Sequence, residues 1–292
     1  MNKPIALGIA SLAALSLALA GCGGDNNDGS SDTTGDTTTA LAVVGKPFST
    51  ELYGVGLPKD SPYCEQVNDA IAAMIDDGAW QAKLDSEMQG VEYTPNPQTN
   101  PPKDFEDCGT PGSASLAAAG KLTIGIKFDQ PHLGFKEGNA YTGFDVDVAT
   151  SVAGKLGFSP DQIVWTESIS SQRETLLQNH QVDMIFATYS ITDARKEKVQ
   201  FAGPYFVAGQ DLLIRAGDTA ITGPESLNDG KKLCSVAGST PAQRIKDEYA
   251  SGVQLVEFKT YSECVQALIA NKVDAVTTDD IILAGLAAAS VK

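Results

Sequence analysis

LLQNHQVDMIFAT occupies residues 176–188, and ALIANKVDAVTTD follows the same plan at residues 267–279. Each stretch leaves a helical pattern, passes an Asn-containing turn and enters a short apolar run that begins with Val-Asp. A short apolar run between turn residues indicates a strand buried on both faces of a parallel sheet. Both runs end in hydroxyl or acid residues, where an open α/β sheet presents a ligand. Two such units facing each other would line one site, although strand–helix units also resemble one another without a functional reason.

The same alternation continues along the chain from residue 121. Helical patterns separate apolar runs, which predicts the α/β fold class. The expected strands are 122–127, 162–166, 182–187, 211–215, 232–236, 253–258 and 273–277, and the expected helices are 144–157, 171–179, 241–250, 261–271 and 280–290.

The first 39 residues are not expected to belong to this fold. Lys3 precedes an apolar run at residues 5–20, which is shorter than the roughly 20 residues of a membrane span and indicates a secretory signal over 1–22. Its end, Leu-Ala-Gly-Cys22, resembles a bacterial lipobox, which implies acylation of Cys22; an ordinary signal peptide with an incidental cysteine is the alternative. Residues 23–39 contain no apolar side chain and predict a disordered tether.

Charge and cysteine content fit an exported protein. The net charge of −16 disfavours nucleic acid as a partner. Four cysteines remain after Cys22, which allow three pairings, and an oxidising compartment favours disulfides. We expect Cys64–Cys108 and Cys234–Cys264, with free buried thiols as the alternative. The sequence has no CxxC, and its two histidines are far apart, so no metal site and no cofactor is expected.

Several motifs together carry a family resemblance. They are GIKFDQP (125–131), YTGFDVDVA (141–149), ATYSITDARKEKVQFAGPYF (187–206) and VAGSTPAQ (236–243). This combination resembles the extracellular amino-acid-binding proteins of ABC importers, and among them the glutamate-binding lipoproteins of high-GC Gram-positive bacteria. The resemblance implies a periplasmic-binding-protein-like fold of type II, in which two α/β lobes are joined by two hinge strands.

An amino-acid ligand needs a cation and hydroxyl or amide groups for its α-carboxylate. Arg195 follows Thr192 at the start of a short helix, where its guanidinium can hold a carboxylate through two parallel hydrogen bonds. Thr188 and Ser190 offer oxygens nearby. The resemblance implies that Arg195 binds the α-carboxylate, with Ser190 and Thr192 lining the same place. A surface arginine at a helix cap is the alternative.

The second lobe is expected to contribute an anion site and an acid. In Gly238-Ser239-Thr240-Pro241, Pro241 suits the first helical position and Thr240 the N-cap, which leaves free N–H groups. The resemblance implies that this segment closes on the same carboxylate. It also implies that Asp279 binds the α-ammonium, whereas the alternative makes Asp279 a helix N-cap.

Residues that select the ligand side chain are harder to assign. The resemblance places Arg173 where glutamate binders hold the distal carboxylate, although an exposed helical arginine is the alternative. Lys127, Gln130 and Gln210 are further candidates. Phe128 is expected to pack on the aliphatic part of the ligand.

The order of the segments departs from the family. The usual order begins at a strand like 122–127 and passes the Val-Asp strand at 273–277. It then adds a strand, a crossover, two helices and a Pro-rich tail. Here those pieces stand at residues 41–109, which predicts a circular permutation and a close approach of Leu41 to Ser290.

The permuted order sets the expected domains. Lobe 1 is 50–109 and 121–208, lobe 2 is 40–45 and 213–292, and the hinge is 46–49 and 209–212. The predicted function is a monomeric, lipid-anchored receptor on the extracellular face of the membrane. It would bind glutamate, or a related acidic or polar amino acid, and deliver it to an ABC permease. It is not expected to be an enzyme. A dehydratase-like enzyme and a sensory binding module are the alternatives.

Overall fold

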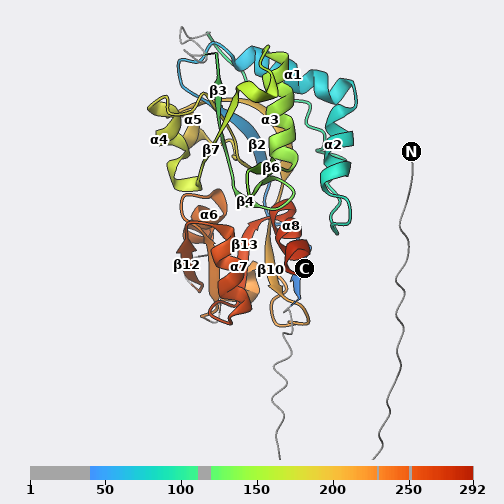
Figure 1. The fold of residues 1–292 in the computed structure, drawn as a ribbon. Helices are drawn as coiled ribbons and strands as arrows, with labels where there is room; N and C mark the ends of the chain where they lie inside the picture. Colours follow the sequence, from blue (N-terminus) through green and yellow to red (C-terminus); the bar gives the residue numbers. More distant parts are fainter. Residues whose placement is uncertain (1–39, 111–119, 229, 250–251, 292) are drawn as a thin grey trace, which may run out of the picture. The chain divides into compact units, whose positions relative to one another are not determined.

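The computed structural model describes residues 40–110, 120–228, 230–249 and 252–291. The expected signal sequence with Cys22 and the tether at 23–39 lie outside the described residues. Figure 1 shows the described chain folded around two sheets, one above the other in that view. Among the described residues, no helix has the length and apolar character needed to span a bilayer.

The strands and helices follow the predicted alternation, with ends that differ from the predicted ones by at most two residues. The strands are β1 (Leu41–Val43), β2 (Glu51–Leu57), β3 (Leu122–Ile126), β4 (Asp129–Gln130), β5 (Gly134–Glu137), β6 (Ala140–Thr142), β7 (Ile163–Glu167), β8 (Met184–Phe186), β9 (Gln200–Ala208), β10 (Gln210–Arg215), β11 (Lys232–Val236), β12 (Gln254–Phe258) and β13 (Ala275–Asp279). The α-helices are α1 (Cys64–Asp76), α2 (Ala79–Glu87), α3 (Phe144–Lys155), α4 (Arg173–Gln178), α5 (Asp193–Lys196), α6 (Thr240–Glu248), α7 (Tyr261–Ile269) and α8 (Asp280–Ser290). Short 3-10 turns lie at Pro160–Gln162, Ser170–Gln172 and Pro224–Leu227.

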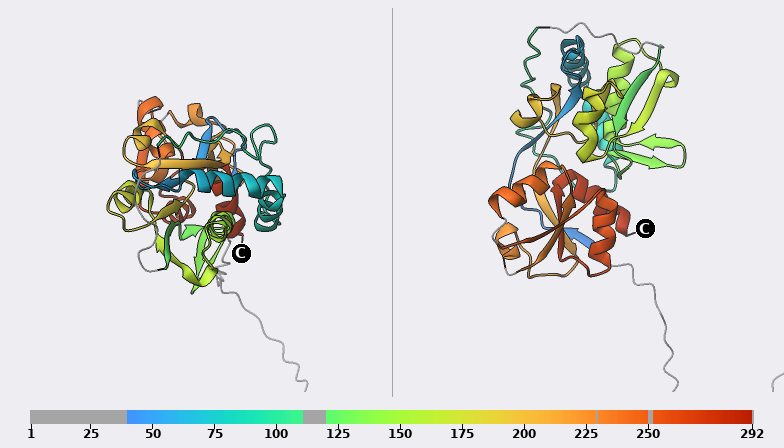
Figure 2. Two further views of the ribbon diagram at one scale, coloured as in Figure 1. Left: turned by 90° about the horizontal axis from the view of Figure 1, so that it is seen from above. Right: turned by 90° about the vertical axis from the view of Figure 1, so that its left-hand side faces the viewer.

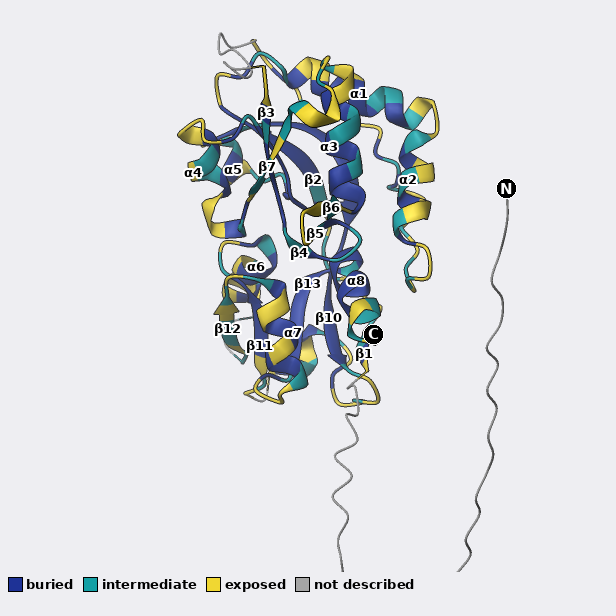
Figure 3. Ribbon diagram, viewed as in Figure 1, coloured by how far each residue is buried: buried dark blue, intermediate teal, exposed yellow. Residues whose placement is uncertain are grey.

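Lobe 1 is built on a five-stranded sheet in the order β7-β3-β8-β2-β9. Strand β3 pairs in parallel with β7 and β8, whereas β2 is antiparallel to β8 and β9. The central strand β8 is buried throughout, as its continuous apolar run predicted. Figure 3 shows the neighbouring strand β2 largely in dark blue, the colour of buried residues. A small antiparallel sheet of β4, β5 and β6 follows β3.

Lobe 2 is built on a second five-stranded sheet in the order β1-β10-β13-β11-β12. Strands β11, β12 and β13 are parallel, and β10 runs antiparallel to β1 and β13. The two repeat stretches therefore deliver β8 to one sheet and β13 to the other. In its own sheet each of these strands has a parallel neighbour: β8 lies beside β3, and β13 lies beside β11. The α/β, two-lobe fold class is confirmed.

Two segments cross between the lobes side by side. One is residues 44–50, between β1 and β2, and the other is Gly209, between β9 and β10. Hydrogen bonds join the first segment to Gln210, the residue that follows Gly209. The Phe48 N–H donates to the Gln210 carbonyl at 2.9 Å, and the Gln210 N–H donates to Ser49 Oγ at 2.9 Å. A Cβ on Gly209 would lie 2.7 Å from Pro47, so this close approach requires glycine. Bending of the lobes would therefore occur at a narrow, two-stranded connection.

Residues 41–109 contribute to both lobes. They supply β1 to the edge of one sheet, β2 to the interior of the other, and α1 and α2 beside α3 (Figures 1 and 2). The apolar face predicted for α1 packs inward, because Val67, Ala70, Ile71 and Met74 are buried. The helix ends before Gly78, whose φ of +78° suits glycine. Near the other end of the chain, α8 packs against β1, and Leu41 lines the same cavity as Val291, which follows Ser290.

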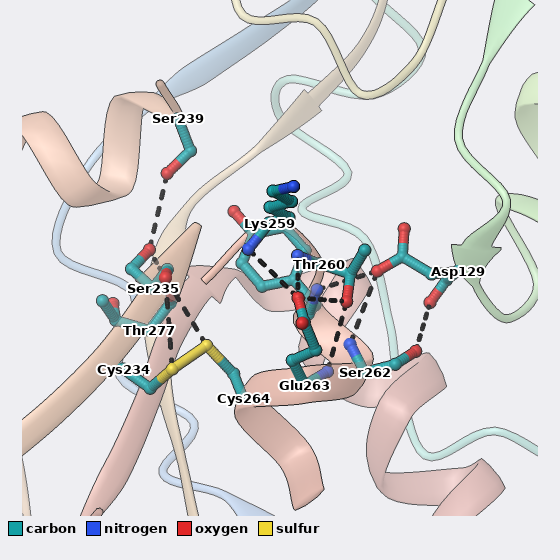
Figure 4. The surroundings of a disulfide bond; sticks show 11 residues. Asp129, Cys234, Ser235, Ser239, Lys259, Thr260, Ser262, Glu263, Cys264 and Thr277 are labelled. Atoms are coloured by element: carbon teal, nitrogen blue, oxygen red, sulfur yellow. Dashed lines mark hydrogen bonds between the residues drawn. A yellow bond between two sulfur atoms is a disulfide. The ribbon is translucent and has the colours of Figure 1, made fainter. Parts of the chain in front are cut away.

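Both expected disulfides are present, as Cys64–Cys108 and Cys234–Cys264. The first joins α1 to the Pro-rich segment, where Asn68 also donates to the Glu106 carbonyl at 3.0 Å. The second joins β11 to α7 (Figure 4). Both pairings are confirmed.

Removal of the first disulfide should destabilise the protein strongly. Replacing Cys64 and Cys108 together by alanine is expected to lower the free energy of unfolding by about 3 to 4 kcal/mol, because the bridge closes a long loop in the unfolded chain. Denaturant unfolding followed by circular dichroism measures the loss. The comparison variant is Cys234→Ala, Cys264→Ala, which removes the other disulfide. The cysteines of that disulfide are 30 residues apart in the sequence, whereas Cys64 and Cys108 are 44 residues apart. A loss below about 1 kcal/mol for both variants would contradict this account.

Candidate functional site

Arg195 lies between the two lobes. It belongs to α5 in lobe 1, and its Nη1 donates to the Ser190 carbonyl of the same lobe at 2.7 Å. Its Nη2 donates to the Gly238 carbonyl of lobe 2 at 3.0 Å. Its Nε lies 3.3 Å from a carboxylate oxygen of Glu174. Protein acceptors thus hold the guanidinium in place, and its Nη2 is directed at lobe 2.

The segment Gly238–Thr240 meets Arg195 from lobe 2. The hydroxyls of Ser190 and Thr240 lie 2.9 Å apart across the two lobes. A Cβ on Gly238 would lie 2.8 Å from the Ser171 Cα, so the backbones of the two lobes approach closely here. Glycine is needed at this point both for space and for a φ of +78°.

The helix start in this segment differs from the prediction. Ser239, not Thr240, is the N-cap of α6, and its Oγ accepts from the Ala242 N–H at 3.1 Å. Thr240 is already the first helical residue, because the turn at Gly238 brings Ser239 into an extended conformation. The Thr240 hydroxyl is therefore available to Ser190 instead of capping its own helix.

Asp279 ends β13 with its side chain fully enclosed. Its Oδ2 accepts from the Tyr53 hydroxyl at 2.6 Å, and its Oδ1 is buried without a hydrogen-bond partner among the described residues. The side chain does not cap α8, although the residue stands at the N-cap position. Instead, Asp280 accepts from the N–H groups of Gly209 and Ile281. Burial, followed by the negative charge of Glu51, raises the pKa of Asp279 well above its usual value.

Arg173 is buried rather than exposed on its helix. Its Nη1 donates to the Ala187 carbonyl at 3.0 Å. The guanidinium carbon lies 4.3 Å from the centre of the Tyr189 ring, and that of Arg195 lies 4.9 Å from the same ring. Burial, followed by repulsion from Arg195, lowers the pKa of Arg173 to about 10. The two arginines are therefore held beside one aromatic ring at the lobe 1 side of the site.

Lys127 is a second buried cation near Arg173. Its side chain is 1% exposed, and its Nζ lies 3.4 Å from the Ser170 hydroxyl and 4.0 Å from Asp129. Burial is the main cause that lowers its pKa to about 8; the charge of Asp129 opposes this shift and that of Arg173 adds to it. Asp129, at 4.0 Å, is the only carboxylate within that distance of the Lys127 ammonium among the described residues, so a ligand anion at a shorter distance would stabilise the buried charge.

Gln130 and Thr188 lie together in the same part of lobe 1. Thr188 Oγ1 is 3.2 Å from Gln130 Oε1, and Gln130 Nε2 is buried without a partner among the described residues. Thr188 has a φ of +44°, and its N–H donates to Asp145 at 2.9 Å. Asp145 also accepts from the Tyr205 hydroxyl at 2.8 Å, and burial raises its pKa to about 6. Asp145 thus fixes the strand end that carries Thr188.

The remaining predicted residues have other contacts. The Thr192 side chain caps α5 by accepting from the Arg195 N–H. Phe128 packs on Tyr141, with ring centres 5.4 Å apart. Gln210 is fully buried in β10 and donates to the Thr277 hydroxyl at 2.9 Å. The structure therefore brings Arg195, Ser190, Gly238 and Thr240 into direct contact across the lobes, while Arg173 and Gln130 lie within lobe 1.

Several residues of this region were not predicted. They are Tyr53, Glu174, Tyr189 and Asp145. Asp145 carried a signal, because it alternates with apolar residues, as Asp147 does, in the first turn of a helix. Tyr53 carried none, because its partner Asp279 is 226 residues away in the sequence.

The arrangement of these groups could bind both charged groups of a zwitterion. Arg195 with two hydroxyls and the start of α6 suits a carboxylate, and the unpartnered oxygen of Asp279 suits an ammonium. Lys127 and Arg173 add positive charge beyond these groups. Among the described residues, no cluster of three potential metal-ligating side chains was found.

A family model and the sequence relatives of this chain indicate the same family. The model of the bacterial extracellular solute-binding proteins, family 3, matches residues 122–280. The glutamate-binding protein GluB of Corynebacterium efficiens is 51% identical over 189 residues, which cover 62% of this chain and 64% of that protein. The glutamine-binding protein of Geobacillus stearothermophilus is 37% identical over 181 residues, which cover 61% of this chain and 68% of that protein. The chain thus spans just under two thirds of the GluB protein.

Solved structures agree with the fold. An ancestral arginine-binding protein bound to glutamine has a TM-score of 0.53 and 35% identity, over 57% of this chain and 72% of that one. The ancestral amino acid-binding protein AncCDT-1, described as a precursor of cyclohexadienyl dehydratase, has a TM-score of 0.52 and 30% identity, over 56% and 71%. The names of the sequence relatives are those of binding proteins, not of enzymes.

Proposed function

Because the chain belongs to the bacterial extracellular solute-binding proteins, family 3, we propose that it is the amino-acid receptor of an ABC importer. The lobes would close on the ligand by bending at residues 46–49 and 209–212. The observation that carries the proposal is the position of Arg195 and Asp279. Arg195 reaches across both lobes, while Asp279 has a buried oxygen without a partner. Together they match the α-carboxylate and α-ammonium of an amino acid.

The side chain of the proposed ligand is acidic, and L-glutamate fits best. Lys127 and Arg173 are both almost fully buried, and among the described residues the only carboxylate within 4.0 Å of Lys127 is Asp129, at 4.0 Å. A neutral ligand side chain would add nothing to this partial compensation of two cations, whereas a distal carboxylate would compensate them further. Names of relatives in the family include both glutamate- and glutamine-binding proteins, and the charge of the site favours glutamate.

Isothermal titration calorimetry tests this proposal. The purified protein would be titrated with L-glutamate, L-glutamine, L-aspartate and L-asparagine at pH 7. We expect saturable binding that is strongest for glutamate, with no chemical change in the recovered amino acid. Tighter binding of glutamine would contradict the assigned side-chain class. Turnover to a product would instead favour an enzyme on this scaffold.

Lys127 should make glutamate binding depend on pH. Its pKa of about 8 means that the ligand-free protein loses the lysine proton as the pH rises through this value. The affinity for glutamate is therefore expected to fall by up to about tenfold between pH 7 and pH 9, while the affinity for glutamine changes little. Lys127→Met should lower glutamate affinity at pH 7 by about tenfold or more and remove the pH dependence.

The same variant has a built-in control for folding. Because burial penalises the protonated lysine, Lys127→Met should keep or raise the melting temperature of the ligand-free protein. Lys136→Met changes an exposed lysine of β5 and should leave both the affinity and its pH dependence unchanged. Unchanged glutamate binding in Lys127→Met would remove Lys127 from the site.

The wider biology is part of the same proposal. Acylation of Cys22 would anchor a monomeric receptor to the outer face of the membrane, and residues 23–39 would tether it near its permease. Mass spectrometry of the mature N-terminus tests this point. An unmodified protein released into the medium would contradict the lipid anchor.

We also propose that the chain is a circular permutation of the family order. Residues 41–109 lie outside the matched range 122–280, yet they complete both sheets. The packing of α8 against β1 supports a former connection between them. A rearranged chain, with 121–292 followed by a short linker and 41–109, should fold with the same two disulfides and the same affinity. Failure of this chain to form both disulfides would count against the permutation.

A further inference from the structure

Arg244 forms a contact between the lobes that lies outside the groups assigned above. It belongs to α6 of lobe 2, and its Nη2 donates to Glu51 Oε1 at 2.7 Å. Glu51 begins β2 of lobe 1 and also accepts from the Ser49 hydroxyl at 2.9 Å. The other guanidinium nitrogens are engaged within lobe 2, because Nε donates to Gln210 at 3.0 Å and Nη1 to Glu248 at 3.2 Å. All three nitrogens of Arg244 thus have protein partners.

The two members of this ion pair are buried to different extents. The Glu51 side chain is 3% exposed and the Arg244 side chain 26% exposed. An exposed ion pair contributes little, but a buried carboxylate that loses its cation is costly. Arg244 is the only cation within 4.0 Å of Glu51 among the described residues. Glu51 therefore depends on a residue of the opposite lobe for its neutralisation.

Glu51 also stands close to the proposed ammonium site. Its charge is the largest electrostatic contribution that raises the pKa of Asp279, after burial itself. Other groups that affect the pKa of Asp279 are Tyr53 of β2, Asp280 of α8 and Arg173 of α4. Gln210, which binds Arg244, is the neighbour of Asp279 across β10 and β13. The pair therefore connects the crossing strands to the strand that carries Asp279.

We propose that Arg244 is a positioning residue, which holds the lobes closed through Glu51 and so raises ligand affinity without contacting the ligand. The inference rests on the proposed function, because it assumes that ligand binding requires closure. Opening of the lobes would separate Arg244 from Glu51 and expose both to water. Closure would restore the pair, so its free energy would add to that of ligand binding.

Calorimetry with L-glutamate on the wild type and four variants tests this inference. Arg244→Gln leaves Glu51 buried without a cation in the closed state and should weaken binding by roughly tenfold or more. Glu51→Gln should weaken binding less, because the remaining arginine is partly exposed. The double variant should bind more tightly than Arg244→Gln alone. Lys246→Gln is the matched control, because Lys246 lies on the same helix and pairs with Glu257 within lobe 2 at 2.8 Å. Its affinity should equal that of the wild type.

Two further measurements separate closure from simple stability. The melting temperature of the ligand-free protein should change little more in Arg244→Gln than in Lys246→Gln, because the pair forms only in the fraction of ligand-free molecules whose lobes are closed. The dissociation rate of glutamate, measured by stopped-flow fluorescence, should rise in Arg244→Gln by the same factor as the dissociation constant. A loss of melting temperature in Arg244→Gln without a change in affinity would overturn the proposal. So would a double variant that binds as weakly as Arg244→Gln.

Small-angle scattering of the ligand-free proteins keeps the inference testable apart from the ligand. Arg244→Gln should have a larger radius of gyration than the wild type and Lys246→Gln. If the wild type binds none of the four amino acids, the proposed function fails, and the scattering comparison alone decides on the lobe contact. Equal radii of gyration in all three proteins, with equal affinities where binding occurs, would overturn it.

Discussion

Replacing Asp279 by asparagine is expected to lower the affinity for L-glutamate by about a hundredfold or more. Oδ1 of this carboxylate has no hydrogen-bond partner in the part of the chain that the structure describes, whereas Oδ2 accepts from Tyr53, so Oδ1 is the oxygen left for a ligand. An amide of the same shape removes the negative charge that would pair with the ammonium in a buried place. Loss of one member of such a pair costs on the order of 3 to 5 kcal/mol. Calorimetry at pH 7 measures the change.

Stability should change in the opposite direction. The folded pKa of Asp279 is raised, so the carboxyl stabilises the ligand-free protein only while it is protonated. This contribution is present at acidic pH and is lost as the pH rises through the folded pKa. Asparagine does not ionise, so Asp279→Asn avoids this loss of stability. The melting temperature of the ligand-free variant at pH 7 should therefore equal or exceed that of the wild type.

Tyr53→Phe is the matched variant for the Asp279 prediction. It keeps the carboxylate and removes only the hydroxyl at 2.6 Å. An intermediate loss of affinity is expected, because the charge remains but its orientation is no longer fixed. Wild-type affinity in Asp279→Asn would show that the ammonium binds elsewhere.

Arg195→Lys should also reduce glutamate affinity by about a hundredfold. The guanidinium donates at once to the Ser190 carbonyl and to the Gly238 carbonyl of the opposite lobe. A lysine ammonium keeps the charge but lacks the planar fork that reaches two acceptors and a ligand carboxylate together. The loss should appear in calorimetry for every amino acid that binds, because the α-carboxylate is common to all.

The control for this variant is Lys198→Met, an exposed residue that follows the same short helix. It should leave affinity unchanged. Arg195→Lys should also differ from Lys127→Met in its pattern, since the latter should affect glutamate much more than glutamine. Equal losses for glutamate and glutamine in both variants would show that the two cations do not have separate roles.

Most of the architecture was predictable because it depends on local patterns. Apolar runs placed β8 and β13, and the helix after Asp280 ends at Ser290 as expected. The disulfide pairings followed from which elements each cysteine would join. The cap of α6 was placed one residue late, because the left-handed turn at Gly238 shifts the helix start and no residue type reveals that turn unambiguously.

The contacts of the site were less predictable, because they join residues far apart in the chain. Tyr53 meets Asp279, and Glu51 meets Arg244, through the pairing of strands from opposite ends of the sequence. The resemblance indicated Arg173 as a ligand group, but its burial against Tyr189 depends on packing. A sequence pattern specifies which face of an element is buried, and it does not specify which distant polar group will share that interior.

The edge strand β1 has a mechanical consequence. It is antiparallel to β10, and its first residue, Leu41, is paired with Arg215, the last residue of that strand. A pulling force applied at residue 40, away from the sheet, would load these backbone hydrogen bonds one after another, as a zipper opens. Once β1 is peeled away, tension would reach residues 44–50 and their bonds to Gln210. Single-molecule pulling from residue 40 should then find glutamate released at a lower force than is needed to unfold the lobe 1 sheet.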